Sequence, residues 1–495
     1  MRASGILMHI SSLPSPYGIG TMGREAFKFI DFLKESHQHY WQILPVCPTS
    51  YGDSPYQSFS THAGNPYFID FDLLAEDGLL KKSDYEKLTW GDDPPRVDYE
   101  KIYNNRFKVL RIAYTNFVKG NMSDFYRFLD DNERWISNYA LFMAIKNEHK
   151  GKAWSEWDEP LKRRDPHSLW CFKESHKDEV EFWEFIQYVF YCQWSSLRKY
   201  AKENDIEIIG DLPIYVAMDS ADVWVSPDLF DLDESLSPKT VAGCPPDGFS
   251  ADGQLWGNPI YKWQRHAETG YQWWIDRMTS AKKLYDVIRI DHFRGFDEFY
   301  SIPYGDATAR NGHWEKGPGM ELFNALSDKF GKLPIIAEDL GFLTPSVKQL
   351  LEDSGFPGMK VLEFAFDPRE ESDYLPYNYD KNSVCYIGTH DNPPAAAWIN
   401  ELDTETLKFC KNFIGCKSNN ISEFIDTFIR TAMATVSDTC IIQMQDWLEL
   451  GENARMNTPA VPHGNWQWRM KKNAITNALS ERIAEITKLY GRTRG

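Results

Sequence analysis

Eight short apolar runs along the chain end in polar or charged residues and alternate with segments of helical period. The clearest run, at 287–290, is typical of a parallel strand covered on both faces, and Asp291 follows it. Similar runs lie at 5–10, 40–46, 206–216, 334–340, 359–366, 384–392 and 439–446, and helix-period segments at 24–34, 181–204, 320–332, 346–353, 403–413, 421–437 and 473–489. This alternation predicts an α/β chain folded as a parallel (β/α)8 TIM barrel.

Two long stretches separate early members of this series. Residues 61–180 are charged and Trp-rich with little strand pattern, so we expect an inserted subdomain after the second strand. Residues 217–269 are dense in Gly and Pro, which favours turns rather than helix, and we expect an inserted loop subdomain over the active site. Because a plain barrel needs roughly 250 residues, a single catalytic barrel over 1–495 has room for both insertions.

Composition excludes several classes of protein. The net charge is -18 with acidic and basic residues interleaved, which argues against a nucleic-acid partner or an anionic membrane surface. The first apolar run, 5–10, is too short for a signal peptide or a membrane span. The eight cysteines are scattered without a Cys-x-x-Cys pair, so we expect free thiols in the cytoplasm.

Acidic residues stand at the ends of four predicted strands. They are Asp211, Asp291, Glu338 or Asp339, and Asp391. In a barrel these ends meet at one mouth, where four carboxyls repel one another, and their pKa values should be pushed apart. One protonated acid among ionised carboxylates is what glycoside cleavage requires.

Arg289 lies two residues before Asp291, so on a strand the two side chains point the same way. The guanidinium is expected to lower the pKa of Asp291 and to keep it ionised, which suits a nucleophile. A structural ion pair at a strand end is an equally good interpretation of these two residues alone.

Three alternative functions are less well supported. A metal-dependent hydrolase would need clustered ligands, but His37 and His39 precede the second strand and so belong at the opposite face. His292 and His390 each adjoin an Asp, and neighbours on a strand face differently. The glycine pattern at 18–23 starts well past its strand, which argues against dinucleotide binding. Mere glycan binding needs no cluster of acids, and we expect no metal and no cofactor.

Seven sequence blocks, taken together and in order, carry a family resemblance. They lie at 210–216 (GDLPIYV), 241–247 (VAGCPPD), 256–259 (WGNP), 289–295 (RIDHFRG), 337–341 (AEDLG), 388–392 (GTHDN) and 455–459 (RMNTP). They resemble the signatures of the 4-α-glucanotransferases, called amylomaltases or disproportionating enzymes, which form glycoside hydrolase family 77 of the α-amylase clan.

The resemblance implies a role for individual residues. Asp291 would be the nucleophile, Glu338 rather than Asp339 the general acid/base, and Asp391 the transition-state stabiliser. Arg289 would support the nucleophile. The implied substrate-binding positions are Tyr56, Asp211, Trp256, Asn258, His292, His390 and Asn457, and we add Phe249, the aromatic of the Pro-Pro-Asp loop. Here Gly248 precedes Phe249, where some members carry an aromatic residue.

The implied reaction is a retaining transfer through a covalent glucosyl-enzyme intermediate. A segment of an α-1,4-glucan would pass to the 4-hydroxyl of glucose or of another glucan. An α-amylase-type α-glucan hydrolase is the alternative, in which water takes the second step. We expect maltooligosaccharides and glucose as donor and acceptor, and a monomer or weak homo-oligomer.

Overall fold

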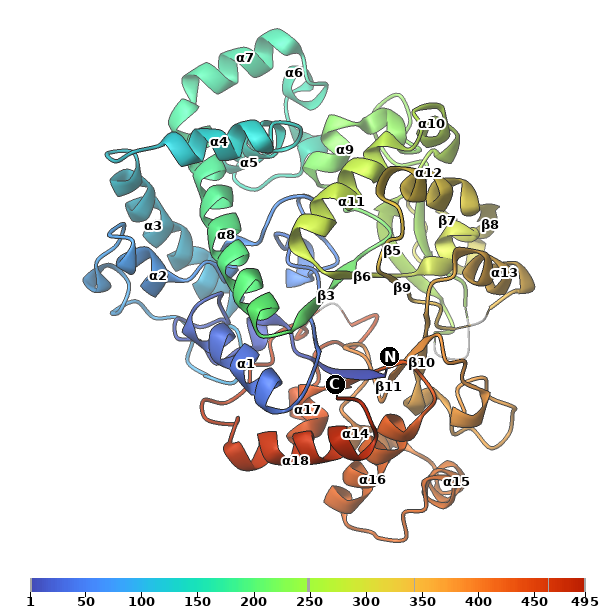
Figure 1. The fold of residues 1–495 in the computed structure, drawn as a ribbon. Helices are drawn as coiled ribbons and strands as arrows, with labels where there is room; N and C mark the ends of the chain where they lie inside the picture. The colour runs from blue at the N-terminus through green and yellow to red at the C-terminus, as the bar shows by residue number, and fades with distance from the viewer. Residues whose placement is uncertain (1, 247–249, 342, 462, 494–495) are drawn as a thin grey trace.

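A computed structural model describes residues 2–246, 250–341, 343–461 and 463–493. Its centre is a closed barrel of eight parallel strands in the order β1-β12-β11-β10-β9-β6-β3-β2 (Figure 1). The barrel strands are β1 (Ala3–Leu7), β2 (Tyr40–Gln42), β3 (Glu207–Leu212), β6 (Val287–Ile290), β9 (Ile335–Ala337), β10 (Gly358–Val361), β11 (Ser383–Tyr386) and β12 (Thr439–Gln443). All eight overlap the predicted runs, which confirms the TIM barrel.

Each barrel strand is apolar on both faces because one face lines the interior and the other meets the helices. Ile209 and Ile336 belong to the inner cluster, while Ile208 and Ile335 pack in the outer one. Side chains two residues apart on a strand share a face, so the inner row that contains Ile209 continues to Asp211 at the mouth. The same alternation therefore builds the core and aims the charged residues at the mouth.

The helices that cover the barrel are α1 (Arg24–Glu35), α8 (Lys177–Glu203), α11 (Gln272–Leu284), α12 (Met320–Phe330), α13 (Pro345–Ser354), α14 (Ala395–Glu401), α15 (Thr404–Ile414), α16 (Ile421–Ala434) and α18 (Asn477–Leu489). Most of them lie close to the predicted segments, whereas α11 and α14 were not predicted. Several starts are capped by a side chain, as where Thr344 accepts from the Val347 N–H. Near the two ends of the chain, Arg492 donates to the Ala3 carbonyl (3.1 Å).

The chain between β2 and β3 is helical. It contains α2 (Phe71–Glu76), α3 (Tyr99–Phe117), α4 (Ser123–Asp131), α5 (Ile136–Glu148), α6 (Glu159–Lys162) and α7 (Pro166–Ser175). Together with the first turns of α8 they stand to one side of the barrel, at the upper left of Figure 1. The long helix α8 connects this group to the barrel, because its last turns lead directly into β3.

The Gly- and Pro-rich stretch 217–269 is more regular than we predicted. It contains the helices α9 (Ala221–Val225) and α10 (Trp263–Glu268) and the strands β4 (Thr240–Cys244) and β5 (Gln254–Pro259). These strands join β7 (Glu298–Pro303) and β8 (His313–Lys316) in an antiparallel sheet of order β5-β4-β7-β8. The expectation of turns rather than helix was wrong for α9 and α10, and the sheet was not foreseen because half of it comes from beyond β6.

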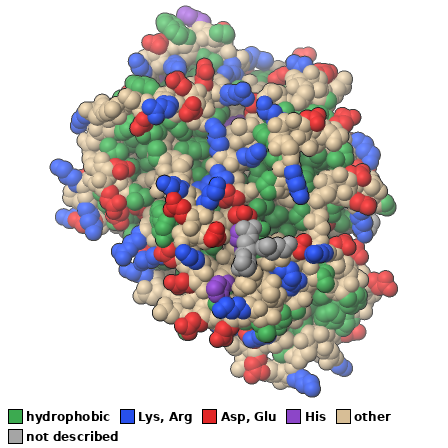
Figure 2. All heavy atoms as spheres, viewed as in Figure 1, with side chains coloured by type: hydrophobic (Ala, Val, Ile, Leu, Met, Phe, Trp, Pro, Cys, Tyr) green, Lys and Arg blue, Asp and Glu red, His purple; other side chains and the backbone are tan. Residues whose placement is uncertain are grey.

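The surface reflects the interleaved acidic and basic residues of the sequence. Acidic and basic side chains are interspersed over the face seen in Figure 2. None of the described helices combines the length and the apolar character needed to cross a bilayer. His39 lies 3.3 Å from Glu207, the first residue of β3, which confirms that the 37–39 histidines lie at the N-terminal face of the barrel.

Candidate active site

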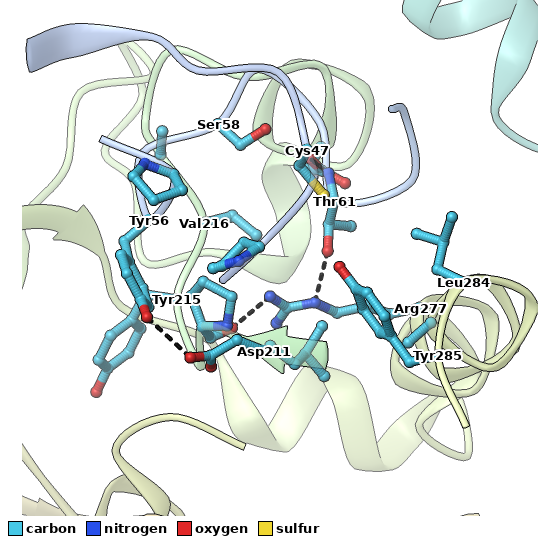
Figure 3. A pocket seen from close by; sticks show the side chains of 17 residues that line it. Cys47, Tyr56, Ser58, Thr61, Asp211, Tyr215, Val216, Arg277, Leu284 and Tyr285 are labelled. Carbon is cyan, nitrogen blue, oxygen red and sulfur yellow. Dashed lines mark hydrogen bonds between the residues drawn. The ribbon is translucent and has the colours of Figure 1, made fainter. Parts of the chain in front are cut away.

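A buried guanidinium forms the centre of the mouth. Nη1 of Arg289, on β6, lies 2.6 Å from Oδ2 of Asp211 on β3 and 3.0 Å from Oδ1 of Asp291. Tyr56 donates its hydroxyl to the same Asp211 oxygen (2.8 Å; Figure 3). The predicted contact between Arg289 and Asp291 is confirmed, and Arg289 also bridges to the neighbouring strand.

Arg289 does not dominate the titration of Asp291. Burial raises the pKa of Asp291 well above its usual range, Arg289 lowers it, and the charges of Asp211, Glu338 and Asp391 raise it further. The expectation of a lowered pKa was wrong, because one cation faces several carboxyls in a partly dehydrated mouth. The charges of Asp211 and Asp291, with smaller contributions from Tyr56 and Glu338, outweigh the effect of burial on Arg289 and raise its pKa well above the ordinary value.

Glu338 and its neighbour Asp339 face opposite ways. Glu338 follows β9, and its two carboxyl oxygens accept from the backbone N–H groups of His292 (2.7 Å) and Leu340 (2.8 Å). Asp339 instead accepts from the Met359 N–H (2.6 Å) on β10 and is 3% exposed. Burial raises the pKa of Glu338, while Arg289 and the two N–H groups lower it. The geometry thus separates two acids that spacing alone could not.

Asp391 and His390 lie on a turn beyond β11. Nε2 of His390 is 3.4 Å from Oδ1 of Asp391, and Asn457 donates to the same oxygen (2.6 Å). We expected His390 and Asp391 to face differently, and this was wrong because β11 ends at Tyr386 and strand alternation no longer applies. The His292 ring packs nearly perpendicular to Trp256, with the ring centres 4.9 Å apart.

Two residues that sequence reasoning did not single out hold this turn by hydrogen bonds, and Trp466 packs beside it. The side-chain oxygen of Asn392 accepts from the Thr389 N–H (2.9 Å), and Arg455 donates to the Asp391 carbonyl (3.2 Å). Trp466 lies 6.0 Å from the His390 ring. Asn392 and Arg455 stand inside the sequence blocks at 388–392 and 455–459, which was the available signal.

Aromatic and amide groups complete the site. Tyr56 stacks on His390 with ring centres 5.1 Å apart and an angle of 14°. Asn258 is buried, donates to the Val216 carbonyl (2.9 Å) and lies 3.2 Å from Gln57 Nε2, so its amide already has protein partners. Phe249 lies outside the described residues, as does Gly248.

Burial favours the neutral form of the two histidines of the site. Burial lowers the pKa of His292 to about 3 and lowers that of His390 as well. Neutral rings can donate and accept hydrogen bonds with sugar hydroxyls. Among the described residues, no group of three or more His, Cys, Asp or Glu side chains could hold a metal ion.

Comparisons with known proteins agree with this geometry. The family model described as 4-alpha-glucanotransferase matches residues 8–476. A 4-alpha-glucanotransferase of Clostridium butyricum is 48% identical over 98% of this chain and 100% of its own length. The structure of an amylomaltase from Streptococcus agalactiae in complex with acarbose superposes with a TM-score of 0.97 at 45% identity, covering 100% of both chains.

A more distant structure shows the same fold. An amylomaltase from Corynebacterium glutamicum gives a TM-score of 0.79 at 18% identity, covering 98% of this chain and 75% of that one. With a matching family model over most of its length and relatives of near-equal length at 48% identity, the chain belongs to the 4-alpha-glucanotransferase family, glycoside hydrolase family 77.

Proposed function

We propose that this chain is a retaining 4-α-glucanotransferase in which Asp291 is the nucleophile and Glu338 the general acid/base. The observation that carries the assignment is the Arg289 guanidinium, which lies against the Asp291 carboxyl at 3.0 Å. Among the groups that shift the pKa of Asp291, this guanidinium is the one that lowers it and so favours the ionised nucleophile, while burial raises the pKa of Glu338 and favours the proton that a general acid must carry. Glu338 can then protonate the leaving oxygen while Asp291 attacks the anomeric carbon.

The remaining residues have supporting roles in this proposal. Asp391, fixed by Asn457, stabilises the positive charge that develops on the sugar ring. The hydrogen-bonding groups for sugar hydroxyls would come from Asp211, His292 and His390, and the stacking face from Tyr56. Trp256 would contact the sugar beyond the cleaved bond, and Gln57, which donates to the Trp256 carbonyl and to the Asn258 amide oxygen, would hold these two residues together.

Transfer rather than hydrolysis requires that a sugar hydroxyl outcompete water for the intermediate on Asp291. The names of the relatives favour the transferase, and we propose that maltooligosaccharides serve as donors and that both these sugars and glucose serve as acceptors. We further propose a monomer or weak homo-oligomer in the cytoplasm.

The deciding experiment is incubation of the purified protein with maltotriose, followed by separation of the products. A transferase yields longer oligomers together with glucose and conserves the number of reducing ends. A hydrolase yields only smaller sugars and adds one reducing end per cut. New reducing ends in proportion to every cut would overturn the transferase assignment.

A further inference from the structure

A buried acid that the proposed mechanism does not use lies directly under the turn that carries Asp391. Glu363 follows β10 and is 7% exposed, and its N–H donates to the carbonyl of Ile387, just past β11 (3.1 Å). A Cβ placed on Gly388 would lie 3.0 Å from the carboxyl carbon of Glu363 and 3.0 Å from one of its oxygens. The turn therefore begins in van der Waals contact with this carboxyl.

Glu363 lacks the donors that an ionised carboxylate needs. Neither of its oxygens has a hydrogen-bond partner within the described part of the chain, although the Asn392 side chain lies beside it. A second acid stands at the far end of the segment, where Oδ1 of Asp446 accepts from the Ala395 N–H (2.7 Å). Asp446 is 1% exposed and its other oxygen is also without a partner. The segment 387–395 thus contacts a buried carboxyl near each of its ends.

The groups that face Glu363 make its ionisation costly. Burial, followed by the charges of Asp446 and Glu401, raises the pKa of Glu363 well above its usual range, while Arg455 and Asn392 lower it. Burial also raises the pKa of Asp446 to about 7. Because burial and the two like charges outweigh Arg455 and the Asn392 amide, the carboxyl takes up a proton instead of staying ionised.

We propose that Glu363 is a positioning residue which, in its protonated form, supports the Gly388–Asn392 turn and so places His390 and Asp391, and that loss of this proton disrupts the turn at high pH. The inference rests on the assignment of Asp391 to the reaction made above. It adds a group that touches neither substrate nor reacting atoms.

The consequence of deprotonation follows from Arg455. This guanidinium donates to the Asp391 carbonyl (3.2 Å) and to the Asn457 carbonyl (3.0 Å), so it holds both residues that form the stabilising pair. An ionised Glu363 would compete for Arg455 and would repel Asp446. Either movement displaces Asp391 relative to the sugar, and small misplacements of catalytic groups reduce turnover strongly.

The test compares Glu363→Gln and Glu363→Ala with the wild type for transfer from maltotriose, with kcat and KM measured from pH 5 to 9.5. Glu401→Gln is the matched control, because it makes the same chemical change beside the same Arg455 at an exposed position. Glutamine preserves the shape of the neutral acid. At pH 6.5 we expect Glu363→Gln to keep kcat within about threefold and Glu363→Ala to lose roughly 10- to 100-fold.

The pH profile separates positioning from simple filling of space. Glu338 must also keep its proton, so the wild-type decline in kcat at high pH should be steeper than one ionisation allows. In Glu363→Gln it should flatten to a single ionisation, whereas Glu401→Gln should keep the steep decline, moved at most to lower pH because the charge of Glu401 raises the pKa of Glu363. An unchanged slope in Glu363→Gln, or wild-type kcat in Glu363→Ala, would overturn the proposal.

Thermal unfolding tests the protonation state of Glu363 without an activity assay. If Glu363 is protonated in the folded protein, the unfolded chain alone ionises above about pH 4.3, so the wild type loses stability relative to Glu363→Gln as pH rises from there. The difference in Tm should therefore grow with pH, and a constant difference would overturn the proposal. Asp391→Asn, assayed alongside, reports separately on the site assignment: wild-type turnover in that variant would refute the assignment while leaving the unfolding result interpretable.

Discussion

Residues of the mouth fall into two groups, carried by strands and by turns, and the two groups are held in place differently. Asp211 and Arg289 belong to β3 and β6, and the backbone ladder continues through Asp291, whose N–H donates to Leu212 (3.0 Å), and Glu338, whose N–H donates to Ile290 (3.0 Å). His390 and Asp391 instead lie on a turn held by the side chains of other residues.

The difference shows where rigidity comes from at this site. In the strand group, position follows from the hydrogen bonds that close the barrel, and the charges of neighbouring strands neutralise one another through Arg289. In the turn group, position depends on Asn392, Arg455, Asn457 and the buried acid Glu363. We therefore expect changes in the strand group to reduce both activity and stability, and changes in the turn group to reduce mainly activity.

The largest effect is expected for the two proposed catalytic acids. Asp291→Asn and Glu338→Gln each remove one step of a two-step reaction with almost no change of volume, so turnover should fall by at least about 10⁴-fold. Glucose release from maltotriose measures turnover, and thermal unfolding measures the stability of each variant. Because the acids act as a unit, the double variant should lose little more than either single one. Wild-type-like turnover in a single variant would contradict the assigned roles.

Removal of the central cation should be the largest change in stability. Arg289→Met leaves Asp211 and Asp291 without their shared partner, and breaking a buried ion pair in this way costs about 3–5 kcal/mol. The loss should be smaller at pH 5 than at pH 7.5, because the abandoned carboxyls can take up protons. Urea unfolding at both pH values measures it, with Arg289→Lys as the control that keeps the charge. A loss that is equal at the two pH values would show that charge is not its cause.

The turn group should give the opposite result. Asn457→Ala removes the 2.6 Å hydrogen bond to Asp391, so kcat should fall roughly 10- to 100-fold, while the free energy of unfolding changes by only about 1 kcal/mol. Asn465→Ala is the matched control, since Asn465 holds the same loop through Thr458 without a hydrogen bond to Asp391. Equal losses of kcat in both variants would mean that the loop as a whole, and not the bond to Asp391, matters.

The same division explains what could be predicted from the sequence. Short apolar runs located the eight strands, and the acidic residues at the ends of some of them placed Asp211, Asp291 and Glu338 at one mouth, because side chains on a strand point in directions set by local alternation. Beyond the end of a strand, alternation no longer sets the direction of side chains, so the contact between His390 and Asp391 was missed. The sheet of β4, β5, β7 and β8 was missed because its pairing joins segments on both sides of β6. The raised pKa of Asp291 could not be predicted from the sequence, because it depends on the burial of the carboxyl and on all neighbouring charges together.

The smallest effect is expected where the two groups meet. Tyr56 belongs to neither group, yet its hydroxyl donates to Asp211 in the strand group and its ring stacks on His390 in the turn group. Tyr56→Phe keeps the ring and removes one hydrogen bond, and Asp211 retains Arg289 at 2.6 Å, so kcat/KM should fall by only about five- to tenfold. Tyr56→Ala also removes the stacking face and should lose considerably more. The two variants, assayed with maltotriose, compare the polar link to the strand group with the aromatic link to the turn group. If Tyr56→Phe is as damaging as Tyr56→Ala, the hydroxyl on Asp211 is the functional contact and the ring contributes little.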